Sequence, residues 1–173
     1  ATIRIRNNFE VTLEACQNSK YINNSTKETY RSAFTDALEN ELKENNLIIA
    51  DSAKAEYELE ITQLKVIENI SSEIANNDSS YQNGEKFDVY GCGVYFYGTL
   101  YKNGNKIDEL KADASREESL SNNRTFWEWI FGLNRDHSSY HVKGLSSSVF
   151  EKLSFKCGKR ACAVITKKIV KGK

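Results

Sequence analysis

Two histidines four residues apart are the first residues whose type and spacing could support chemistry. His137 and His141 follow Asp136 closely, and on one turn of helix the two imidazoles could share a metal ion. The flanking Asn134 and the serines between the histidines are typical of a loop, and the sequence offers no third ligand. We therefore predict surface histidines, no metal site and no cofactor.

Three glutamates on one strand are the second candidate. Glu56, Glu58 and Glu60 alternate with apolar residues, so they share one face of a predicted strand. Adjacent carboxylates would lie about 7 Å apart by strand rise, and pairs of acids can hydrolyse glycosides. The solvated outer face of a half-buried strand explains them more simply. The sequence contains no phosphate-binding glycine loop and no nucleophile elbow, and we predict that the protein is not an enzyme.

The four cysteines bear on the compartment. Cys16, Cys92, Cys157 and Cys162 are an even number and allow two disulfides in three connectivities. Buried free thiols in a cytosolic protein are the alternative, and the spacing does not suit zinc. The chain begins at Ala1 and contains no Met, which we interpret as removal of an upstream segment, either a signal peptide or a trimmed stretch. Together these features favour a periplasmic or secreted protein.

Composition indicates one globular domain spanning residues 1–173. The 173 residues are 39% hydrophobic, with 24 basic and 24 acidic side chains, and no apolar run approaches the roughly 20 residues that cross a bilayer. Residues 51–120 carry 7 basic and 14 acidic side chains, whereas residues 121–173 carry 11 and 3. We interpret the basic end as the solvated face of a last helix, and we predict no nucleic-acid partner.

The first half of the chain alternates between strand and helix patterns. Residues 2–13 alternate apolar and polar side chains, which predicts a strand that ends near Cys16. Ser25 and Glu28 form a capping-box pattern, and the stripe Tyr30, Phe34, Leu38 and Leu42 predicts a helix that ends at Asn45 and Asn46. A further strand then covers residues 55–67.

The second half of the sequence contains two polar stretches and predicts a hairpin and a last helix. We expect a mobile loop at about 69–85 and a polar and aromatic insertion at about 115–140. Between them lie an aromatic strand with Gly91, Gly93 and Gly98, which indicate bulges or close backbone approach, and a hairpin turn at residues 102–106. Residues 145–165 keep helical spacing, although a hairpin through Gly158, with Cys157 facing Cys162, is the alternative.

These elements predict an α+β fold. We expect two layers, with an antiparallel sheet of about four to five strands and two main helices packed on one face. The order of a short strand, a capped helix, the acidic strand 55–61, a curved aromatic hairpin and a basic helix resembles the periplasmic domains of small bacterial outer-membrane lipoproteins, such as the lipopolysaccharide-assembly lipoprotein. That resemblance implies a lipid anchor upstream, a periplasmic location and a role in binding or assembly.

The segment from Phe126 to Phe131 is the most aromatic part of the sequence. Such residues anchor partner contacts or lie at a membrane interface, although packing on the core is the simpler alternative. We predict that a protein or lipid partner is bound through these side chains: Phe126, Trp127, Trp129, Ile130 and Phe131. An immunity or inhibitor protein that docks on a toxin is a second hypothesis, and a small hydrolase is the third.

Overall fold

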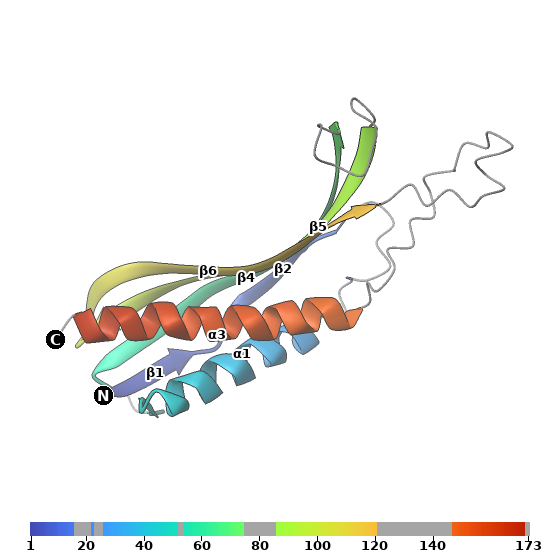
Figure 1. Ribbon diagram of the computed structural model, residues 1–173. Coiled ribbons are helices and arrows are strands. Elements are labelled where there is room, and N and C mark those ends of the chain that lie inside the picture. Colours follow the sequence, from blue (N-terminus) through green and yellow to red (C-terminus); the bar gives the residue numbers. More distant parts are fainter. Residues whose placement is uncertain (16–21, 23–25, 52–53, 75–85, 121–146, 172–173) are drawn as a thin grey trace, which may run out of the picture.

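The structure is a computed structural model that describes residues 1–15, 22, 26–51, 54–74, 86–120 and 147–171 (Figure 1). Within these ranges the strands are β1 (Thr2–Arg6), β2 (Glu10–Glu14), β3 (Ile48–Ile49), β4 (Tyr57–Ile74), β5 (Lys86–Lys102) and β6 (Asn105–Leu120), and the helices are α1 (Lys27–Glu44) and α3 (Ser147–Lys171). Neither helix is long and apolar enough, over its described residues, to cross a membrane.

The described residues form two layers. Both helices cover the same face of the sheet (Figure 1), with α1 beneath β2 and β3 and α3 beneath β5 and β6. The core lies between the layers, and its largest fully buried side chains include Tyr30, Tyr57, Phe34, Phe96 and Phe150. The predicted α+β fold with two helices on one face is therefore confirmed.

The sheet is mixed. Its strand order is β3-β1-β4-β5-β6, with β2 also paired to β4. The pairs β4–β5 and β5–β6 are antiparallel, as predicted. By contrast, β1 pairs in parallel with β3 and β4, and β2 pairs in parallel with β4. The chain passes through α1 between β1 and its partners, and such a crossover returns the next strand in the same direction.

The sheet extends into two polar stretches that the sequence analysis predicted to lie outside it. Residues 69–74 extend β4 into the predicted mobile loop, and residues 115–120 extend β6 into the predicted insertion. Both stretches pair with β5, so backbone hydrogen bonds hold them where no apolar period exists. The remainder of both predicted segments lies outside the described residues. The predicted hairpin turn is confirmed, with Asn103 at φ 50° and Gly104 at φ 83°.

The sheet is irregular where β1 gives way to β2. The predicted single N-terminal strand is split, because β1 ends at Arg6 and β2 begins at Glu10, both beside β4. The β4–β5 register shifts between Ile61 and Gln63, close to Gly98 of β5. A Cβ atom on Gly98 would lie 2.9 Å from the carbonyl oxygen of Glu60. Glycine is therefore required there by the close backbone approach that the sequence indicated.

Helix α1 follows its predicted pattern. Its buried side chains are Tyr30, Phe34, Ala37, Leu38 and Leu42. The helix ends at Glu44 with Asn45 as its C-cap, and Asn46 follows with φ 60° in the left-handed region that asparagine tolerates. The N-cap is Thr26, which makes no side-chain capping hydrogen bond, and Ser25 lies outside the described residues.

Helix α3 is continuous, so the alternative hairpin through Gly158 is wrong. Gly158 instead lets α3 approach α1 closely. A Cβ atom there would fall against the carbonyl oxygen of Phe34 and lie 2.9 Å from the Cβ of Ala37 and 3.1 Å from the backbone nitrogen of Leu38. Backbone atoms of a packed helix cannot move aside as a flexible side chain can.

We expect Gly158→Ala to destabilise the protein. Alanine gains about 1 kcal/mol in helix propensity, but overpacking against backbone costs about 1–3 kcal/mol, so we expect a net loss of about 1 kcal/mol and a midpoint about 2–4 °C lower. Thermal unfolding by circular dichroism measures this. The matched control is Ala163→Gly, an exposed position of the same helix, which should lose about 1 kcal/mol by propensity alone. A more stable Gly158→Ala variant would show that the helices separate freely.

Candidate functional site

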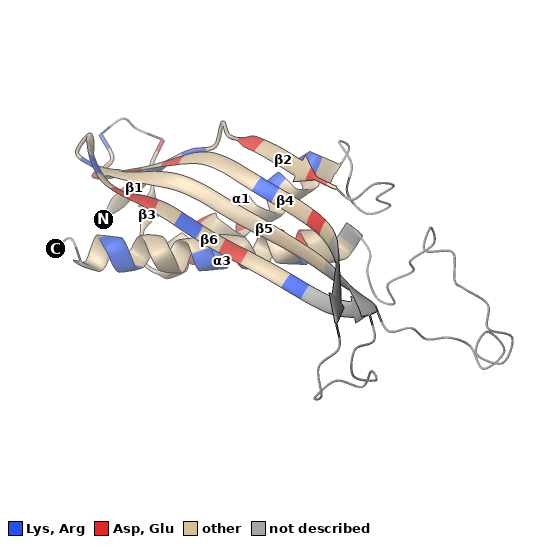
Figure 2. Ribbon diagram, turned by 90° about the horizontal axis from the view of Figure 1, so that it is seen from above, with Lys and Arg blue, Asp and Glu red and all other residues tan. Residues whose placement is uncertain are grey.

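The sequence-predicted site residues fall into two groups. The aromatic segment from Phe126 to Phe131 and the histidines His137 and His141 lie outside the described residues. The three glutamates are described. Glu58 and Glu60 alternate with buried core residues of β4, so they lie on the face of the sheet opposite the helices, which we call the outer sheet face and which Figure 2 views from above. Glu56 precedes β4 on the same side. Among the described residues, no group of three or more His, Cys, Asp or Glu side chains could hold a metal ion.

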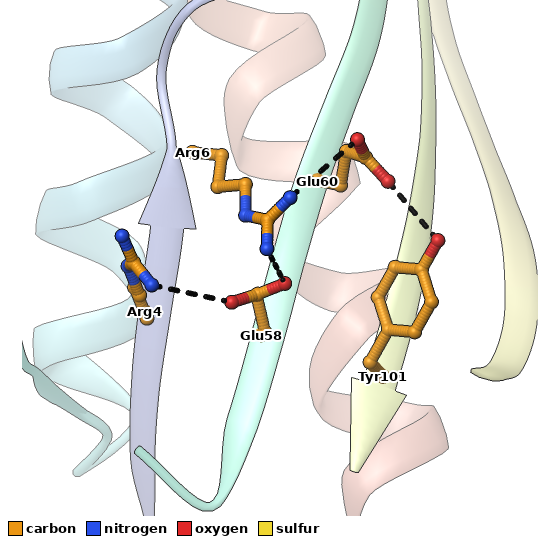
Figure 3. A network of polar contacts seen from close by, with 5 residues as sticks. All are labelled: Arg4, Arg6, Glu58, Glu60 and Tyr101. Carbon is orange, nitrogen blue, oxygen red and sulfur yellow. Dashed lines mark hydrogen bonds and ion pairs between the residues drawn. The ribbon is translucent and has the colours of Figure 1, made fainter. Parts of the chain in front are cut away.

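The outer sheet face carries an ion-pair ladder between β1 and β4. The parallel register places Arg4 beside Glu58 and Arg6 beside Glu60. Glu58 forms ion pairs with both arginines, with N–O distances of 3.6 Å to Arg4 and 2.7 Å to Arg6. Arg6 also lies 3.9 Å from Glu60 (Figure 3). Each carboxylate of this pair is therefore engaged by a cation from the neighbouring strand.

A tyrosine from β5 completes the ladder. The hydroxyl of Tyr101 donates to Oε2 of Glu60 at 3.0 Å (Figure 3). This hydrogen bond, followed by burial, raises the pKa of Tyr101 above its ordinary value. The third predicted glutamate, Glu56, pairs with Lys102 at 3.7 Å. Around these side chains lies a polar hollow of about 480 Å³, whose lining includes Arg6, Lys54, Glu56, Glu58, Glu60 and Tyr101.

The sequence predicted that the glutamates share one face of a strand, but it did not predict which cations they pair with. Arg4 and Arg6 have the same two-residue spacing as Glu58 and Glu60. That match was the available signal for parallel pairing between the first strand and the acidic strand. The glutamates lie on the outer face that the sequence predicted, and cross-strand ion pairs hold them there.

The polar pairing continues along the rest of the face. The ammonium of Lys65 lies 2.5 Å from Oε1 of Glu14 of β2, and the hydrogen bond that Lys65 donates to Glu14 raises the pKa of Lys65. Gln63 donates to the hydroxyl of Thr12 at 3.0 Å. On the other side of β4, the ammonium of Lys111 lies 5.8 Å from the ring centroid of Tyr97. The outer sheet face thus presents charged and aromatic side chains that are already paired with one another.

The predicted disulfides among three of the cysteines are absent. Cys92, Cys157 and Cys162 are free and buried, and each faces a different neighbour. Cys92 Sγ lies 3.6 Å from the carbonyl oxygen of Arg116, Cys157 Sγ lies 3.6 Å from that of Ala112, and Cys162 Sγ lies 3.7 Å from Nδ2 of Asn45. Five residues apart on one helix, Cys157 and Cys162 point to different sides and cannot bond. Cys16 lies outside the described residues.

A second concavity runs between the two helices on the side away from the sheet. It has a volume of about 460 Å³ and is lined by residues that include Glu41, Lys159, Cys162, Thr166 and Val170. Lys159 and Glu41 form an ion pair across it. Val170 is one of the few large apolar side chains exposed among the described residues. The groove is therefore open and mixed in polarity.

No protein-family model and no curated protein matches the sequence. Among solved structures, a homolog of neuraminyllactose-binding hemagglutinin from Helicobacter pylori is similar with a TM-score of 0.51 at 15% identity, over 97% of this chain and 82% of that chain. Rare lipoprotein B from Shewanella oneidensis is similar with a TM-score of 0.44 at 13% identity, over 95% of this chain and 98% of that one. A minor lipoprotein from Acinetobacter baumannii is similar with a TM-score of 0.38 at 13% identity, over 88% of this chain and 90% of that one.

Bacterial lipoproteins are thus among the solved structures similar to this chain, in line with the resemblance seen in the sequence. At these identities the similarity is one of fold.

We expect the Arg6–Glu58 ion pair to contribute less than about 1 kcal/mol. The Arg6 side chain is half exposed, and exposed ion pairs give about 0.2–1 kcal/mol in double-mutant cycles. Urea unfolding of the wild type, Arg6→Ala, Glu58→Ala and the double variant measures the coupling free energy, which should shrink as salt is raised. A coupling above about 2 kcal/mol that persists in salt would show that the ladder is effectively buried.

We expect the described thiols to react slowly in the folded protein. Burial raises the pKa of Cys157 to about 12 and that of Cys162 to about 11, from an ordinary 9.0, so neither forms the reactive thiolate at pH 8. Alkylation followed by peptide mass spectrometry should label both only after unfolding. Since unfolded thiols ionise first, stability should fall as the pH rises above about 9. Rapid labelling of the folded protein would contradict this arrangement.

Proposed function

We propose that the chain is a non-enzymatic binding domain of the bacterial cell envelope that contacts a protein or a lipid partner. The observation that carries the proposal is how the described polar groups are used. The acids of the outer sheet face are held in ion pairs, and the three described thiols are buried. A general acid, base or nucleophile has to be poised at a surface that a substrate can reach.

The fold supports the same proposal of a binding domain. The Helicobacter pylori protein similar in fold is a homolog of a hemagglutinin named for binding, and one fold can present different binding surfaces. A location in the periplasm or outside the cell, with an anchor in the outer membrane, belongs to this proposal. The cysteines no longer contribute to it, because free buried thiols occur in reducing and oxidising compartments alike.

The contact surface of the proposal is the aromatic segment, with Trp127, Trp129 and Phe131 as its largest side chains. Tryptophan supplies much of the binding energy at protein interfaces, and phenylalanine is enriched there. Tryptophan also favours the headgroup region of membranes. The same side chains could thus serve either class of partner, and the two must be separated by experiment.

We expect the variant Trp127→Ser/Trp129→Ser/Phe131→Ser to bind its partner at least about tenfold more weakly, the effect of losing about 1.4 kcal/mol. The lipid arm measures co-flotation with phosphatidylethanolamine and phosphatidylglycerol vesicles. The protein arm measures capture of a defined partner after chemical cross-linking in intact envelopes. Tyr95→Ser, on the outer sheet face, is the control and should bind as the wild type does.

Two outcomes would count against the proposal in different ways. Unchanged binding by the triple variant would exclude the aromatic segment as the contact, and a large fall in its thermal midpoint would place that segment in the core. Binding to neither vesicles nor any envelope protein would contradict the proposed function itself.

A further inference from the structure

The far edge of β6 has no strand partner among the described residues. β6 is the last strand in the order β3-β1-β4-β5-β6, and no described strand pairs with its other side. Its register with β5 is uninterrupted from Asp108 to Arg116. An edge of this length offers backbone donors and acceptors to any extended chain.

The direction of the backbone groups follows from the register. Cys92 of β5 is paired with Arg116, and its Sγ lies 3.6 Å from the Arg116 carbonyl oxygen, so that carbonyl faces β5. Backbone groups alternate in direction along an antiparallel strand. The N–H and C=O groups of Glu109, Lys111 and Asp113 therefore point away from β5. In agreement with this, Nη1 of Arg160 on α3 donates to the Asp113 carbonyl oxygen at 2.8 Å.

The helix beneath this edge is strongly basic. Arg160 reaches the edge at Asp113, and Lys168 forms an ion pair with Asp108. Lys156 lies one helical turn before Arg160 on the same side of α3, and it is exposed. Glu151 is the only acid in α3. Figure 2 shows α3 running alongside β6 with blue positions along it. A strand added to β6 would therefore place every second side chain above a row of cations.

We propose that the open edge of β6 binds an extended acidic segment of a partner protein as an additional strand. The backbone of the segment bonds to the C=O of Glu109, to both backbone groups of Lys111 and to the N–H of Asp113. The other two outward groups are already held, the Glu109 N–H by Asp108 and the Asp113 carbonyl by Arg160. Acids at alternate positions of the segment meet Arg160 and Lys156. A second copy of this chain fits less well, because pairing β6 with β6 brings two basic α3 helices side by side. The inference uses no residue of the aromatic segment, so it can fail while the proposed function stands.

The test uses two labelled peptides and measures fluorescence anisotropy with the full chain. One peptide alternates valine and glutamate, and the other alternates valine and lysine. We expect the glutamate peptide to bind at least about tenfold more tightly than the lysine peptide.

Three variants test the geometry of the edge. Lys111→Pro should weaken binding of the glutamate peptide at least about tenfold, since proline removes an outward N–H and is tolerated on edge strands. The matched control Lys111→Ala keeps that N–H and should change binding less than about threefold. Arg160→Glu should abolish the preference for glutamate.

Hydrogen exchange gives a second measurement that does not depend on a variant. The amides of Lys111 and Asp113 should exchange rapidly in the free protein and become protected when the glutamate peptide is added. Protection in the free protein would show that the edge is already paired and would overturn the proposal. Equal affinity for the two peptides would overturn it as well, and so would a concentration-dependent dimer that Lys111→Pro dissolves.

Discussion

The contact between the two helices at Gly158 determines how the rest of the described structure is arranged. With no side chain at that position, α3 lies against the backbone of Phe34 and Leu38 in α1. Phe34 in turn stacks on Phe96 of β5, with ring centroids 5.4 Å apart, and Phe96 covers the space above Gly98. Phe34 therefore contacts both layers, since its backbone lies against α3 and its ring lies against the sheet. A wider separation of the helices would pull one of them off the sheet and expose part of the core.

The sequence predicted those elements whose signal is local. The stripe of α1 and the Asn-Gly turn depend on residues close together in the chain, and both are observed as predicted. Parallel pairing of β1 with β4 depends on partners more than fifty residues apart, and a single sequence does not specify which strands meet. The polar ends of β4 and β6 were missed for a related reason, because their strand conformation follows from hydrogen bonding to β5 and not from an apolar period.

The candidate site could likewise be predicted only in part. The row of glutamates and its placement on an outer face could be read from alternation alone. Their engagement by Arg4, Arg6 and Tyr101 could not, since those three residues come from two other strands. The even number of cysteines indicated disulfides, but a count of residues carries no geometry. In the folded chain the three described thiols point toward separate neighbours.

The parallel pairing of β1 also constrains how the chain acquires its structure in time. β1 can pair with β4 only after residues 57–60 have been synthesised, and α3 later closes the layer beneath β5 and β6. Contacts between the two ends of a sequence form slowly. Until α3 has been synthesised, the apolar side chains that β5 and β6 direct toward it stay uncovered, and such exposed surface favours aggregation.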